Sequence, residues 1–183
     1  RAGVRVIDQS LAAGGASVTL DDGTRLGAAL VVGCDGRGSA VAQRAGIGRL
    51  GHDYAQTALV CAVEHDLPHR GIAHQLFLPA GPLAILPLPG ERSSIVWTET
   101  RARADAIARM EPAAYLAELR PRFGDFIGAI RLAGGRHSYP LDLTLATSFT
   151  AERVALAGDA AHGIHPLAGQ GLNLGLRDVA ALA

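Results

Sequence analysis

The sequence predicts a mixed α/β fold in which an antiparallel sheet interrupts a domain built from parallel strands and helices. Near each end of the chain, at about 29–45 and 153–183, an apolar strand-like run leads through an aspartate beside glycine into helix-like sequence. Short apolar runs of this kind are typical of buried parallel strands. The middle, about 52–149, differs, because strand-like runs recur there with turn residues between them.

Composition narrows the class of protein. The 183 residues carry 17 basic and 17 acidic side chains, and 49% are hydrophobic, which is enough for a substantial core. The balanced charge argues against nucleic-acid binding. No apolar run reaches the ~20 residues of a membrane span, and no signal-peptide pattern is seen, so a cytoplasmic location is expected. Cys34 and Cys61 lie in separate apolar runs, where buried free thiols are expected rather than a disulfide.

The first block should form short strands and one short helix. An Asp-Asp-Gly turn at 21–23 separates two of the strands. Ser39 is a plausible N-cap for a helix over 39–45, which Gly46 would end. The expected strands are 4–8, 17–20, 24–28 and 29–35.

The middle block should form an antiparallel sheet with one helical interruption. A helix is expected over 111–119, because Pro112 is tolerated early in a helix and Pro121 should end it. The expected strands are 54–65, 71–79, 81–90, 92–100 and 136–149.

The third block joins a strand over 153–159 to a helix over 169–183. The first turn of a helix presents unpaired N–H groups and a partial positive charge, which favour anionic or polar ligands. Asp159 follows the buried strand directly, so its carboxylate should lie at the carboxyl edge of a sheet, where it suits a ribose or ribityl hydroxyl. The alternative is that Asp159 caps the following turn.

In the loop before this last helix, Gly169 and Gly171 flank Gln170, and glycine lets the backbone approach a ligand closely. Pro166 would stiffen the approach. A ring carbonyl or a developing negative charge could lie against the amides of Leu172 and Asn173. An ordinary tight turn is the alternative. His162 and His165 stand nearby without a Cys or carboxylate cluster at metal spacing, so structural roles are favoured and no metal is expected.

Two motifs resemble a known family. "VVGCDGRGSAVAQRAGI" resembles the DG motif, and "RVALAGDAAHGIHPLAGQGLNLGLRDVAAL" the GD motif, of the FAD-dependent aromatic hydroxylases whose type member is para-hydroxybenzoate hydroxylase. "HPLAGQGLNLGLRD" with "GPLAILPLPGERSSIVW" is most similar to the ubiquinone-biosynthesis hydroxylases, which act on polyprenylated phenols. The resemblance implies an FAD/NAD(P)-binding Rossmann-like domain, 1–51 and 150–183, with an inserted antiparallel-sheet substrate domain, 52–149.

The resemblance also implies roles for particular residues. Asp159 would bind the ribityl chain of FAD, and Pro166 to Asn173 would lie beside the isoalloxazine. Asp35 would serve both FAD and the nicotinamide donor, and Gly36 and Gly158 are further cofactor-binding candidates. The implied chemistry is NAD(P)H reduction of FAD, reaction with O2 and hydroxylation of an electron-rich ring. No general base is assigned. The arginine that usually follows the DG serine is absent: Ala42 stands there, with Arg44 two places on.

The chain starts without methionine inside a strand-like run and stops inside a helix-like one, so we expect an internal fragment of a longer enzyme. The family's G-x-G-x-x-G loop would precede Arg1. The isolated chain should therefore be inactive and bind FAD weakly or not at all. Alternatives are an FAD-dependent reductase, a halogenase, against which the absence of lysine counts, or a non-functional truncated copy.

A lipophilic phenol as substrate would also allow peripheral association with the inner membrane or with a multienzyme assembly. Apolar residues of the middle block would either face such a substrate or form the core of the sheet, and both interpretations stay open. They are Leu76, Leu78, Leu83, Ile85, Leu86 and Trp97.

Overall fold

The computed structural model describes residues 1–183, which divide into two compact units. Unit 1 combines Arg1–His52 with Asp142–Ala183, and unit 2 is Asp53–Leu141. The chain passes from one unit to the other within two long strands, β5 (Arg49–His65) and β9 (Ile130–Ala146). The second junction therefore falls inside a continuous strand, upstream of the expected boundary at 149/150.

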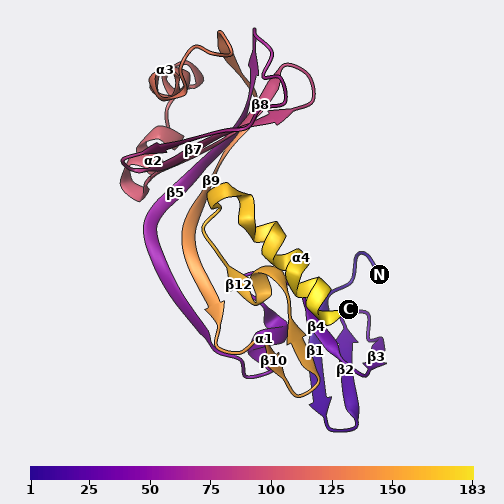
Figure 1. Cartoon of the computed structure of the whole chain (residues 1–183). Coiled ribbons are helices and arrows are strands. Elements are labelled where there is room, and N and C mark those ends of the chain that lie inside the picture. Colours follow the sequence, from indigo (N-terminus) through magenta and orange to yellow (C-terminus); the bar gives the residue numbers. More distant parts are fainter. The chain divides into compact units, whose positions relative to one another are not determined.

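Unit 1 contains two three-stranded sheets (Figure 1). The first is the antiparallel meander β1 (Val6–Ala12), β2 (Gly15–Leu20) and β3 (Arg25–Ala28). The second has the order β10 (Thr150–Ala151), β11 (Val154–Leu156) and β4 (Val31–Gly33).

Strands β4 and β11 pair in parallel although they come from opposite ends of the sequence, with Val31 beside Val154 and Gly33 beside Leu156. This pairing confirms the parallel strands expected from the two apolar runs. It also brings the carboxyl ends of both strands to the same edge of the sheet.

Helix α1 (Ala40–Arg44) packs against this parallel pair. Ser39 is its N-cap, as expected, and accepts a hydrogen bond of 3.0 Å from the Ala42 amide. A Cβ at Gly33 would lie 2.9 Å from Leu156 Cδ2 and 3.0 Å from Val41 Cβ. Glycine at position 33 therefore lets the helix approach the sheet closely.

The remaining elements of unit 1 follow β11. A 3₁₀ turn, η1 (Gly158–Ala160), leads to the short strand β12 (His162–Gly163), which pairs with the Thr144–Leu145 end of β9. A second 3₁₀ turn, η2 (Leu167–Gly169), precedes α4 (Gln170–Leu182). No helix of the structure is long and apolar enough to cross a membrane.

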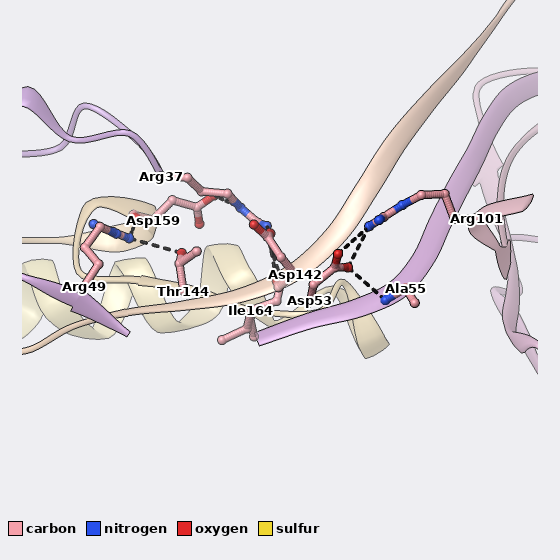
Figure 2. Close-up of polar contacts among 9 residues, drawn as sticks. All are labelled: Arg37, Arg49, Asp53, Ala55, Arg101, Asp142, Thr144, Asp159 and Ile164. Carbon is pink, nitrogen blue, oxygen red and sulfur yellow. Dashed lines mark hydrogen bonds and ion pairs between the residues drawn. The ribbon is translucent and has the colours of Figure 1, made fainter. Parts of the chain in front are cut away.

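Unit 2 is an antiparallel sheet with two helices. Its strands follow the order β9, β5, β8 (Arg92–Thr100), β7 (Gly81–Leu88) and β6 (His74–Leu78), so β6 is an edge strand. Helices α2 (Arg101–Ala108) and α3 (Pro112–Phe123) cover one face. At the start of α2, Arg101 donates to both carboxylate oxygens of Asp53, at 2.7 and 2.8 Å (Figure 2).

The helix-covered face forms the core of unit 2. In the register of the sheet, Leu59 lies opposite Trp97, which lies opposite Leu83. The residues on this face include five of the six considered as substrate-facing: Leu76, Leu78, Leu83, Ile85 and Trp97. The core interpretation therefore applies to these five, and only Leu86, exposed at 39%, points to the opposite face.

Three local expectations were wrong. Helix α3 passes Pro121 and ends at Phe123 with Gly124 as its C-cap, because the added turn buries Phe123 and pairs Arg122 with Glu118. Helix α2 was not predicted at all, since Ala104 and Ile107 are its only buried residues and give little periodic signal. Cys34 is exposed, because β4 ends one residue before it, whereas Cys61 is buried as expected.

Candidate functional site

A pocket of about 270 Å³ lies at the carboxyl edge of the parallel pair in unit 1. It is lined by residues after β4, residues after β11 and one side of α4. The structure thus brings Gly36, Gly158, Asp159 and Leu172 to one pocket. The lining residues include Cys34, Gly36, Gly158, Asp159, Leu172 and Leu176.

Asp159 presents its carboxylate at this edge. The side chain is 46% exposed, and Oδ2 accepts a hydrogen bond of 3.3 Å from Arg37 Nε. The carboxylate does not cap the turn in which it lies, because η1 has no side-chain cap. It is therefore accessible to a hydroxyl donor that enters the pocket.

Arg37 holds this region together, and sequence reasoning missed it. Besides Asp159, its guanidinium donates to the carboxylate and the carbonyl of Asp142 and, at 2.9 Å, to the carbonyl of Ile164 (Figure 2). A Cβ at Gly163 would lie 3.0 Å from Arg37 Nε, so glycine makes room for this side chain. The only sequence signal is an arginine between glycines after the DG pair, and it does not indicate the distant partners.

Arg49 fixes the backbone of the same turn. Its guanidinium donates to the Asp159 carbonyl and to Thr144 Oγ1, each at 3.1 Å (Figure 2). It also donates to the Ala160 carbonyl at 2.6 Å. These bonds satisfy carbonyls that the one-turn helix leaves unpaired. The side chain and the backbone of Asp159 are thus each held by one arginine.

Asp178 of α4 anchors the turn from the other side. Its Oδ2 accepts from the Gly158 amide at 2.8 Å and lies 2.7 Å from His162 Nε2. A Cβ at Gly175 would lie only 3.4 Å from Gly158 Cα, so α4 packs closely on this turn. His162 therefore has a structural partner. Burial lowers the pKa of His165, which favours the neutral form of that ring.

The loop before α4 has an unusual backbone. Ala168 and Gly169 both adopt left-handed conformations, with φ of 53° and 63°. A non-glycine residue in this region is uncommon and often marks a ligand site. Helix α4 begins at Gln170, so the amides of its first turn, including those of Gly171 and Leu172, have no partners within the helix. They form a donor surface of the type that binds anions or carbonyl oxygens.

Asp35 lies just before α1, and its expected contact with FAD and the nicotinamide donor stays a prediction. Its Oδ2 accepts from the amides of Ala40 at 2.7 Å and Val41 at 3.1 Å, so it caps α1. Gly36, with φ of +82°, is the residue of this pair that lines the pocket. Arg44 donates to two carbonyls of β1, and Ala42 is fully buried.

The capping role of Asp35 predicts a pH effect. Partial burial alone would raise its pKa, but hydrogen bonds from Ser39 and the Val41 amide outweigh burial and lower the pKa. A carboxylate whose pKa falls below the unfolded value of about 3.9 stabilises the fold above about pH 4 and loses this effect as the pH falls. Asp35→Asn should therefore cost about 0.5–1 kcal/mol at pH 7, after allowance for solvent screening.

Urea unfolding of the wild type and Asp35→Asn at pH 7 and below about pH 4 checks this, because the stability difference should shrink as the carboxyl group is protonated. Asp105→Asn, an exposed carboxylate on α2, is the control. A difference between wild type and Asp35→Asn that is the same at both pH values contradicts the capping role.

The family described as "FAD binding domain" matches residues 8–183. The ubiquinone hydroxylase UbiL of Rhodospirillum rubrum is 54% identical over 169 residues, which cover 92% of this chain and 39% of that protein. The 3-demethoxyubiquinol 3-hydroxylase of Escherichia coli is 42% identical over 164 residues, covering 89% of this chain and 41% of that protein. The chain thus spans about two fifths of these relatives.

Solved structures share the fold. The flavin-dependent halogenase CmlS superposes with a TM-score of 0.81 at 19% identity, over 97% of this chain and 34% of that one. At this identity the likeness concerns the fold alone. It supports the arrangement expected from the sequence, in which a Rossmann-like FAD-binding domain carries an inserted antiparallel sheet.

Proposed function

Because the chain belongs to the family of FAD binding domains, we propose that it forms the flavin-ring side of a monooxygenase that hydroxylates a polyprenylated phenol in ubiquinone biosynthesis. The observation that carries this proposal is the pocket of unit 1. Asp159 and Leu172, in the first turn of α4, both line it at the carboxyl ends of the parallel strands β4 and β11. The identity of 54% to a ubiquinone hydroxylase supports the substrate class.

The residues of the pocket fit FAD chemically. Asp159 offers an accessible acceptor for a ribityl hydroxyl, held in place by Arg37. Gly36 and Gly158 leave room for close approach of a ligand to the backbone. The unpaired amides after Gly169 would lie beside the pyrimidine edge of the ring, where the helix dipole stabilises negative charge. When bound, FAD would supply the redox chemistry, with NAD(P)H as electron donor and O2 as oxygen source.

The open face of the unit 2 sheet is suited to an apolar substrate. Val96 lies between Val60 and Ala84 on the face opposite α2 and α3, and none of these three is fully buried. Leu86 is exposed on the same face. We propose that these apolar side chains contact the prenyl tail, because the contact removes apolar surface of both partners from water. A substrate of this kind implies that the enzyme acts at a membrane surface.

A hybrid enzyme tests the function. The 169 matching residues of the Rhodospirillum rubrum hydroxylase are replaced by those of this chain, and the parent hydroxylase is the control. The hybrid should purify with one FAD per chain and oxidise NAD(P)H faster when a polyprenylphenol is added. A folded hybrid without flavin would contradict the assignment of the pocket. Flavin without stimulation by any phenol would contradict the hydroxylase and favour a reductase.

A further inference from the structure

A small cavity of unit 2, with a volume of about 50 Å³, lies on the helix-covered side of its sheet. Leu59 of β5 and Tyr115 of α3 are buried in its wall, and Ala108, the last residue of α2, is exposed beside it. Three consecutive residues of β9 complete the lining: Arg136, His137 and Ser138. Because Leu59 and Tyr115 belong to the core under α2 and α3, the cavity is separate from the pocket of unit 1 and from the open face of the sheet.

Arg136 brings a positive charge into this cavity. Its guanidinium carbon lies over the Tyr115 ring, 4.9 Å from the centroid. Its Nη1 atom is buried, and no acceptor of the chain lies within hydrogen-bond distance of it. Arginine stays charged in folded proteins, and a buried charged donor without an acceptor keeps its full cost of desolvation. The contact with the ring offsets only part of this cost, so the arrangement favours a negatively charged acceptor beside Nη1.

The cavity itself supplies no negative charge, since none of its lining residues is a carboxylate. The two weak acids next to Arg136 are the Tyr115 phenol and the Cys61 thiol, which lie 3.6 Å apart. Burial raises the pKa of both groups and outweighs the opposite effect of the Arg136 charge. Both groups therefore keep their protons at neutral pH. Arg136 has no anionic partner among them, and an ion from solution can take that place.

We propose that this cavity binds a small monovalent anion, which accepts a hydrogen bond from Arg136 Nη1. About 10–15 Å³ is enough for one water molecule, so about 50 Å³ admits a halide or an ion of up to about four non-hydrogen atoms. The Ser138 hydroxyl and an N–H of His137 are further donors in the lining. Bound there, the anion links β9 to α3 and stabilises the helix layer on the sheet. The inference does not depend on the proposed function, because the site involves neither flavin nor phenol.

Urea unfolding of the 183-residue chain in sodium bromide and in sodium gluconate of equal concentration tests this binding. Gluconate is too large for the cavity and serves as the salt control. Since the anion binds only the native state, the wild-type unfolding constant should be about tenfold lower in bromide at about nine times Kd than in gluconate. Arg136→Met should lose this dependence on bromide. Arg92→Met removes an exposed arginine of β8 outside the cavity, so it is the matched control and should keep the dependence.

A crystal soaked in sodium bromide locates the ion. We expect an anomalous peak in contact with Arg136 Nη1 in the wild type, and none at this place in Arg136→Met. Each protein is compared with itself in the two salts, so a lower overall stability of Arg136→Met does not affect the result. The proposal is overturned by a wild type that is equally stable in both salts, by Arg136→Met that keeps the bromide effect, or by Arg92→Met that loses it. A water molecule at Nη1 in the bromide crystal would also overturn it.

Discussion

Trp97→Ala is expected to lower the free energy of unfolding of unit 2 by about 3–5 kcal/mol, the range for truncating a large buried aromatic. Trp97 is completely buried, its ring lies 5.9 Å from that of Tyr115, and the Arg122 guanidinium lies 5.0 Å from its centroid. Its indole N–H also donates to Glu99 Oε1 at 3.2 Å. Alanine would leave a cavity and remove a donor from a buried carboxylate, and both effects destabilise.

Urea unfolding followed by far-UV circular dichroism measures this effect, because the variant lacks the chain's only tryptophan. Leu86→Ala is the control on the same sheet, and its loss should stay below about 1 kcal/mol because Leu86 lies on the open face. Equal losses for the two variants would mean that the helix-covered face is not the core.

Asp159→Ala in the hybrid enzyme is expected to weaken FAD binding about tenfold to hundredfold. A hydrogen bond that involves a charged group contributes about 1.5–3 kcal/mol, and about 1.4 kcal/mol corresponds to tenfold in affinity. The variant removes the accessible carboxylate of the pocket, whereas Arg37 keeps its bonds to Asp142 and Ile164. The turn should therefore keep its shape.

Titration of the flavin-free hybrid with FAD, followed by flavin fluorescence, gives the affinity. Asp142→Asn is the matched control, because it removes a carboxylate from the same arginine and Asp142 does not line the pocket. Its affinity should change by less than about threefold. If both variants weaken FAD equally, Asp159 acts only through Arg37 and does not contact the cofactor.

The sequence predicted most elements because their signals are local. The Gly33 and Asp159 junctions carry an apolar run, a glycine and a helix start within a few residues, and the structure pairs their strands in parallel. Alternation predicted the strands of unit 2 but not which face is buried, because that depends on where α2 and α3 pack. Only the structure shows that Trp97 faces these helices and Leu86 does not.

The contacts that hold the site were not predictable from local pattern. Arg37 bonds to Asp142, Asp159 and Ile164, all more than a hundred positions away in the sequence. Asp178 reads as one polar position of an amphipathic helix, yet its carboxylate holds Gly158. Asp35 reads as a ligand residue by resemblance, and the local pattern does not indicate that its Oδ2 also accepts from an α1 amide. In each case tertiary contacts decide what a residue type alone leaves open.

The mass of the product formed by the hybrid enzyme tests the central claim most directly. The reaction is run under ¹⁸O₂ with NAD(P)H and a polyprenylphenol, and the product is examined by mass spectrometry. The account predicts a phenol that has gained one ¹⁸O atom, in an amount that matches the stimulated NAD(P)H oxidation. A hybrid that holds flavin and oxidises NAD(P)H while the phenol gains no labelled oxygen would contradict it.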